Sequence, residues 1–151
     1  MSRNVVVVRR FLAVAVAAVL AAGLTACGGT NSPDPTPITT QLAPMPFSGI
    51  DVAEVAFTDV TVNGNGALTG SADWGSPAND IDIYVTNTAC RATDVFELDG
   101  GCTVMGHTTS STAKPELLTL AVTQGTYRVW IANFGPGAES GTLRLTATVN
   151  R

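Results

Sequence analysis

The 151-residue chain has few basic residues, few aromatic residues and a single histidine. Three of its eight Lys and Arg residues (Arg3, Arg9 and Arg10) stand at the extreme N-terminus, whereas all twelve acidic residues follow them. A chain that loses this N-terminal segment keeps five basic and twelve acidic side chains, so its net charge is near −7. Because binding to nucleic acid requires a basic surface, the composition speaks against a nucleic-acid partner.

The single histidine, His107, limits the catalytic chemistry that the chain can support. A hydrolytic triad requires a nucleophile, a base and an orienting group within hydrogen-bonding reach. His107 precedes the polar run TTSST, so it is predicted to be a loop residue rather than a base. The sequence therefore favours a protein that is not an enzyme.

The N-terminus has the layout of a secretory signal. Its basic residues precede an apolar run, residues 11–24, which is shorter than the roughly 20 residues that a membrane-spanning helix needs. The run ends in LTAC, residues 24–27, which resembles the lipobox of bacterial lipoprotein signal peptides. The resemblance implies a signal peptide over residues 1–26 and acyl chains such as palmitate on the sulfur and amino group of Cys27. The alternative is an ordinary secretory signal in which Cys27 occurs by chance.

A lipidated Cys27 would attach the chain to a membrane of a bacterial cell envelope. Since each buried methylene contributes roughly 0.8 kcal/mol, two or three acyl chains hold a protein firmly. Gly28 follows the cysteine. By resemblance to sorted lipoproteins, this favours the outer membrane over the plasma membrane in a cell that has both, with the protein facing the periplasm or the exterior.

The chain has three cysteines, so lipidation of Cys27 would leave Cys90 and Cys102. Exported proteins lie in an oxidising environment, and an even number of remaining cysteines predicts one disulfide bond. A bridge across CRATDVFELDGGC contributes roughly 3 kcal/mol on the chain-entropy model. A metal site is the weaker alternative, because two thiolates lack the further ligands that zinc requires.

The remaining chain changes in composition near residue 46. Residues 28–46 contain five prolines and few side chains to bury, which predicts an unfolded tether over residues 27–46. Residues 47–151 have a length that suits a single folded domain. Helical periodicity is scarce there, whereas alternation of apolar and polar residues is common.

The alternation is clearest in GTLRLTATV, where Leu143 and Leu145 are predicted to face inward and Arg144, Thr146 and Thr148 outward. The run AFTDVTV is followed by NGNG, which is typical of a β-hairpin. Seven to eight short strands separated by Gly, Pro and Asn predict an all-β domain, an antiparallel β-sandwich.

Two stretches in the same order resemble the bacterial pre-peptidase C-terminal domain family. WGSPANDIDIYV resembles its tryptophan-to-DLDLYV strand, and PELLTLAVTQGTYRVWIANFG with GTLRLTATV resembles its closing strands. The resemblance covers roughly residues 68–149 and implies a jelly-roll-like β-sandwich. Relatives accompany exported enzymes or bind collagen and carbohydrate, some with calcium. No peptidase domain precedes the match here and the loop between the cysteines is not part of the pattern, so we expect a free-standing binding module.

The strand NDIDIYV carries two carboxylates among large apolar residues. Asp80 and Asp82 are two residues apart, so they share one face of the strand. Together with Asp73 and Asn79 they surround one turn, where they are candidate ligands for calcium, which prefers oxygen donors. The alternatives are a solvated strand edge or an ion pair with Arg128 or Arg144 on another strand.

Two aromatic residues are candidate ligand-binding residues. Tyr84 shares the strand face of Asp80 and Asp82, and Trp130 points away from the core if its neighbours face inward. Exposed rings on a sheet commonly contact sugars or collagen-like ligands. The alternative is that Trp130 packs against the second sheet.

The sequence therefore predicts a non-catalytic, lipid-anchored module that binds a polysaccharide, a protein polymer or an envelope protein, with calcium as a candidate stabilising ion. A second hypothesis is a small glycan hydrolase that uses Asp80, Asp82 or Glu116. A third is a structural spacer in an envelope complex.

Overall fold

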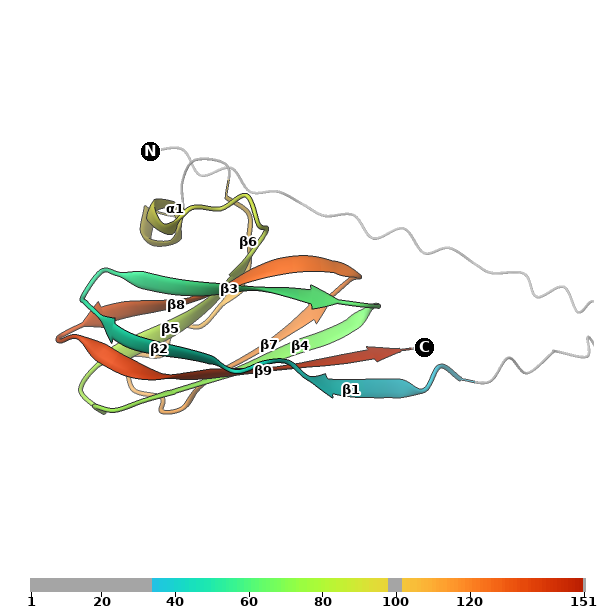
Figure 1. Ribbon diagram of the computed structural model, residues 1–151, viewed down its shortest axis with the longest axis horizontal. Coiled ribbons are helices and arrows are strands. Elements are labelled where there is room, and N and C mark those ends of the chain that lie inside the picture. The colour runs from blue at the N-terminus through green and yellow to red at the C-terminus, as the bar shows by residue number, and fades with distance from the viewer. Residues whose placement is uncertain (1–33, 98–101, 151) are drawn as a thin grey trace, which may run out of the picture. The chain divides into compact units, whose positions relative to one another are not determined.

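A computed structural model describes residues 34–97 and 102–150, which form a β-sandwich of two antiparallel sheets (Figure 1). The predicted signal peptide, residues 1–26, and the predicted lipidation site Cys27 lie outside the described residues. No helix among the residues that the structure describes is long and apolar enough to cross a membrane.

The first sheet, sheet A, has the order β1-β9-β4-β7, and a further strand, β2, also pairs with β9. Its members are β1 (Pro37–Gln41), β2 (Met45–Ile50), β4 (Gly66–Trp74), β7 (Glu116–Val122) and β9 (Glu139–Asn150). The twelve-residue β9 is the centre of this sheet because three strands pair with it.

The second sheet, sheet B, has the order β3-β8-β5-β6. Its members are β3 (Val55–Val62), β8 (Gly125–Gly135), β5 (Asp80–Thr86) and the short β6 (Val104–His107). A helical turn, α1 (Ala92–Glu97), lies between β5 and β6 in the chain. The predicted antiparallel β-sandwich is confirmed, although the described chain has nine strands where seven to eight were predicted.

The predicted tether was wrong in its C-terminal part. β1 and the start of β2 fall within residues 27–46, and both pair with β9, so the folded region begins near Pro37 instead of at residue 47. Proline is tolerated where a strand begins or at a sheet edge, because no ladder hydrogen bond is lost there. The long β9 provides a free edge for this pairing, and Phe47 and Ile50 of β2 then become buried.

The core between the sheets is built from alternate residues of the long strands. Leu143 and Leu145 of β9 face inward as predicted, and Ile81 and Ile83 of β5 meet them from sheet B. Burial of each such side chain contributes roughly 1.5–3 kcal/mol, so this core is the main source of stability.

Candidate functional site

A buried carboxylate organises the turn between β4 and β5. Glu139 Oε1 accepts hydrogen bonds from the backbone N–H groups of Gly75 (3.1 Å) and Ser140 (2.9 Å). Its Oε2 accepts from the N–H of Ser76 and from Nδ2 of Asn79, both at 2.8 Å. Burial alone would raise the pKa of Glu139, but these hydrogen bonds outweigh burial and lower it. Glu139 therefore holds this turn by accepting hydrogen bonds from Gly75, Ser76 and Asn79.

The structure does not bring the predicted calcium ligands together. The amide of Asn79 is used by the Glu139 carboxylate and by the backbone N–H of Gly137, which donates to Asn79 Oδ1 at 2.8 Å. Asp73 lies on β4 in sheet A, whereas Asp80 and Asp82 lie on β5 in sheet B. Since each points away from the core of its own sheet, they face opposite sides of the sandwich. The described residues contain no group of three or more acidic, histidine or cysteine side chains placed to hold a metal ion.

This arrangement predicts that calcium does not stabilise the fold. The melting temperature of the full chain is expected to be the same in calcium as in a chelator, because the Asn79 amide is already hydrogen-bonded and Asp73 lies on a different sheet from Asp80 and Asp82. Differential scanning calorimetry measures this directly. A rise of several degrees in calcium would contradict the assignment of the turn to Glu139.

Asp82 is buried, with 6% of its surface exposed. Its Oδ1 accepts a hydrogen bond from Thr108 Oγ1 at 3.1 Å, and Thr108 itself is held to the backbone of Ile83. Burial raises the pKa of Asp82, the Thr108 hydrogen bond opposes this, and the nearby carboxylates of Asp80 and Glu116 add to it, so that the pKa is about 7. Neither predicted alternative, a solvated edge or an ion pair, describes Asp82.

The two predicted arginine partners are engaged elsewhere or exposed. Arg128 Nε and Nη2 donate to both carboxylate oxygens of Asp59, at 2.7 and 2.8 Å. Asp59 lies directly opposite Arg128 on β3, and the hydrogen bonds from Arg128 lower the pKa of Asp59. Arg144 is exposed on the outer face of sheet A. The charge of Asp82 is therefore not balanced by either arginine.

Two of the three carboxylates of the hydrolase hypothesis, those of Asp82 and Glu116, are buried, and Asp80 is half-buried. Glu116 is 3% exposed, and its Oε2 is buried without a hydrogen-bond partner, as is Asp80 Oδ1. A pKa near 7 at Asp82 would suit a general acid. A general acid must reach its substrate, however, and the burial of Asp82 and Glu116 prevents this in the folded chain.

Tyr84 and Trp130 point to the outer face of sheet B, as predicted, but they are covered. Trp130 is 1% and Tyr84 is 7% exposed. Both pack with Val95 of α1 and with Cys90 in a second hydrophobic cluster, and α1 lies over this side of sheet B (Figure 1). Trp130 Nε1 donates to Thr86 Oγ1 at 2.9 Å, so the polar atom of its ring is also satisfied. The two rings are therefore not exposed, which was the premise of the predicted ligand contact.

The predicted disulfide bond between Cys90 and Cys102 is confirmed. Cys90 is buried in the second cluster and Cys102 packs against it, so the bridge fixes the covering segment to sheet B. The sequence between the two cysteines contains a signal that Tyr84 and Trp130 would be covered. Val95 is an apolar residue in a short helical turn, and a disulfide at both ends of the loop restricts where that turn can lie.

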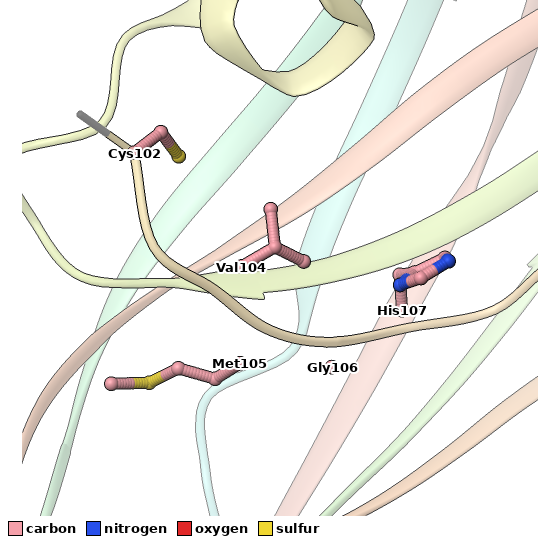
Figure 2. Close-up of a pocket in the computed structure, with 5 residues that line it drawn as sticks. All are labelled: Cys102, Val104, Met105, Gly106 and His107. Atoms are coloured by element: carbon pink, nitrogen blue, oxygen red, sulfur yellow. The ribbon is translucent and has the colours of Figure 1, made fainter. Parts of the chain in front are cut away.

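A hollow of about 490 Å³ lies beside the edge strand β6 and is lined by Cys102, Val104, Met105, Gly106 and His107 (Figure 2). The ring of His107 stacks on Tyr84, with centroids 5.3 Å apart and planes 10° apart. His107 lies in a strand, whereas the sequence predicted a loop. The side chain of Met105 extends away from Val104 and His107. With one ionisable side chain, His107, this hollow offers surface contact but no catalytic set.

The outer face of sheet A carries a continuous set of hydroxyl and amide side chains, which we call the hydroxyl face. All are exposed or half-buried: Thr39, Gln41, Thr69, Ser71, Thr119, Thr142, Thr146 and Thr148. The strand register places Gln41, Thr146, Thr69 and Thr119 side by side in one row across β1, β9, β4 and β7. The next row holds Arg144, Ser71 and Leu117.

Two adjoining hollows run over the hydroxyl face. One, of about 300 Å³, is lined by Gln41, Thr69, Thr119 and other residues of these rows, and the second, of about 230 Å³, includes Asp73 and Thr142. Arg144 lines both, so it joins them. The outward direction of Arg144, Thr146 and Thr148 was predicted and is confirmed. The face as a whole was missed, because the partners of β9 are distant in sequence.

Comparison with known proteins adds little to this geometry. No family model matches the chain, and no curated protein matches it. Among solved structures, it is similar to a carbohydrate-binding module from lichenase 5A of Cellvibrio mixtus, solved in complex with cellotriose. The TM-score is 0.43 at 13% sequence identity, over 76% of this chain and 98% of that chain. At this level of similarity, function has to be argued from the chain's own residues.

Proposed function

We propose that the chain is a lipid-anchored, non-catalytic binding module of a bacterial cell envelope, which holds a polymer or envelope partner on its hydroxyl face. The observation that supports this most is the row from Gln41 to Thr119, which presents four polar side chains across four strands. On sheet B, α1 and the Cys90–Cys102 bridge cover Tyr84 and Trp130, while Thr61 and Thr126 of the same sheet remain exposed. Among the described residues, the outer face of sheet A is therefore the less covered of the two sheet surfaces.

The absence of catalysis in this proposal rests on the placement of the acidic residues. Asp82 and Glu116 are enclosed, and the hollow beside β6 is lined by none of the three candidate carboxylates. Binding without turnover requires only a fixed, accessible surface, and a sheet of paired strands provides one. The resemblance of residues 68–149 to pre-peptidase C-terminal domains agrees with this role.

The anchor is supported by LTAC and by the apolar run before it. Expressed in a bacterium with a lipoprotein-processing pathway, the wild-type chain is expected in the membrane fraction, where it incorporates labelled palmitate. Cys27→Ser is expected to abolish the label and to release the chain from membranes, whereas Cys90→Ser is expected to keep the label. Labelling that persists in Cys27→Ser would contradict the anchor.

The binding face is tested by a substitution that fills it. Thr119→Arg places a long side chain over the hollow of about 300 Å³ and is expected to weaken binding to an insoluble-polymer panel at least tenfold in a pull-down assay. Thr126→Arg makes the same change at an exposed threonine of sheet B and is expected to bind as wild type. Equal binding by Thr119→Arg and wild type would contradict the proposed face. A structural spacer would instead bind no polymer and co-purify with a fixed partner.

A further inference from the structure

Several side chains on the outer face of sheet A are free to bond a ligand. Within the described part of the chain, Gln41, Ser71, Thr119 and Arg144 make no side-chain hydrogen bond or ion pair. Within the hydroxyl face, the hydroxyls of Thr39 and Thr148 bond each other at 2.9 Å, and Thr69 Oγ1 donates to the backbone oxygen of Thr146 at 3.4 Å. A hydroxyl both donates and accepts, an amide does both with separate atoms, and Arg donates only. The free groups thus match a ligand that carries many hydroxyls of its own.

The charge distribution favours an uncharged ligand. The formal net charge of the whole chain is −4, yet the hydroxyl face carries one positive side chain, Arg144, and one negative side chain at its border, Asp73. Other acidic residues lie on sheet B, such as Asp59, or are buried, such as Glu116. A polyanion would be repelled by the net negative charge of the protein, and a polycation would be attracted to acidic residues that lie outside this face.

The face is also unlike a typical protein-binding surface. The centre of a protein–protein interface is depleted of charge and rich in aromatic and large apolar side chains. On the hydroxyl face, the one large exposed apolar side chain among the described residues is Leu117, at 67% exposure. One leucine at the end of a polar row can pack against the C–H groups of a sugar ring, but it does not form an apolar centre.

The shape favours a polymer over a small molecule. Neighbouring strands are about 4.8 Å apart, so the row from Gln41 to Thr119 repeats polar groups at that spacing over roughly 14 Å. The two hollows continue past Arg144 as open surface. Small-molecule sites instead enclose most of their ligand. A chain of sugars that lies across the strands would meet one polar side chain per strand.

From these observations we infer that the ligand of the hydroxyl face is an uncharged polysaccharide, bound across β1, β9, β4 and β7 by Gln41, Thr69, Thr119 and Thr146. This inference rests on the proposed function and specifies its ligand class. Binding is expected to change little with salt, because no ion pair contributes to it.

Affinity electrophoresis of the full chain tests the ligand class. The gels contain uncharged polysaccharides (hydroxyethyl cellulose, dextran, xyloglucan), an anionic one (alginate) or gelatin, at low and at high salt. We expect retardation by at least one uncharged polysaccharide that changes less than twofold between the two salt concentrations. Retardation by alginate or gelatin alone would overturn the inference and leave the proposed function standing. No retardation by any polymer would overturn both.

A matched pair of double variants tests the residues. Gln41→Ala/Thr119→Ala removes the two ends of the row and is expected to weaken binding to the retarding polysaccharide about tenfold. Thr61→Ala/Thr126→Ala removes an exposed threonine pair of sheet B, whose hydroxyls lie 3.2 Å apart, and is expected to leave binding unchanged. Equal weakening in both, or in neither, would overturn the assignment of the ligand to this face. Melting curves of both double variants confirm that each is folded.

Discussion

Replacement of Trp130 by alanine is expected to destabilise the fold by about 3–5 kcal/mol, the usual cost of removing a large buried aromatic side chain. Trp130 is 1% exposed and packs with Tyr84, Cys90 and Val95, so its removal leaves a cavity beneath α1. It also leaves Thr86 Oγ1 without the indole N–H that donates to it. Because natural domains are stable by only about 5–15 kcal/mol, this single change removes a large part of the total.

Urea denaturation of the full chain measures the effect, with Phe57→Ala as the control. Phe57 lies 4.8 Å from Trp130 on the same face but is 49% exposed, and Arg128 covers its ring at 4.2 Å. Loss of Phe57 is expected to cost about 1 kcal/mol, since it removes a partly exposed ring and a cation–π contact. If Trp130→Ala were as stable as wild type, the ring would be an exposed ligand contact after all, and the account of sheet B would be wrong.

The free energy of unfolding is expected to fall as the pH rises from about 4 to about 7, because burial disfavours the ionised form of Asp82 in the folded chain. The ordinary pKa of this carboxyl is 3.8, and burial raises it in the folded chain to about 7. The folded state therefore holds a proton over this pH range that the unfolded state has released, and rising pH favours unfolding. The shift corresponds to a loss of up to roughly 4 kcal/mol, which is complete above about pH 7.

Asp82→Asn isolates this contribution, because an amide oxygen can still accept from Thr108 Oγ1 without carrying charge. The variant is expected to gain a few kcal/mol over wild type at pH 8 and to differ little from it at pH 4, as urea midpoints at both pH values would show. Burial also raises the pKa of Asp80, which acts in the same direction and remains in the variant. Asp34→Asn, at an exposed position, is the control and should follow wild type throughout. A wild-type chain that becomes more stable between pH 4 and pH 7 would contradict the assignment.

Local sequence patterns predicted those features of the fold that depend on neighbouring residues. The alternation along β9 correctly separated Leu143 from Arg144, and the spacing of Asp80 and Asp82 correctly put them on one face of β5. The pairing of Cys90 with Cys102 followed from their number and from the predicted export. Each of these inferences needs only the two-residue period of a strand or the number of cysteines in the chain.

The features that could not be predicted depend on pairing between distant segments. Nothing near Pro37 or Met45 indicates that β9, about a hundred residues later, will pair with both strands. Asp73 and Asp80 are neighbours in sequence, but the chain changes sheets between them, so a shared site could not form. The outward direction of Trp130 was correct, yet its burial depends on packing with Cys90 and with Val95 of α1.

These differences also move the proposed binding site from sheet B to sheet A. Tyr84 and Trp130 suggested a ligand-binding surface, but they form a second small core with Cys90 and Val95. The threonines of β4, β7 and β9 do not individually indicate a binding site, because exposed threonine is common in strands. Their importance arises from the register, which collects them into rows on one open face.

The most direct test of the proposed binding face is a methyl NMR titration of the full chain, labelled at threonine, with the uncharged polysaccharide that retards it most. The account predicts that the methyl signals of Thr69, Thr119 and Thr146 shift with increasing ligand, while those of Thr61 and Thr126 on sheet B stay in place. Shifts confined to Thr61 and Thr126, or to Thr108 near β6, would place the ligand elsewhere and contradict the hydroxyl face as the binding site.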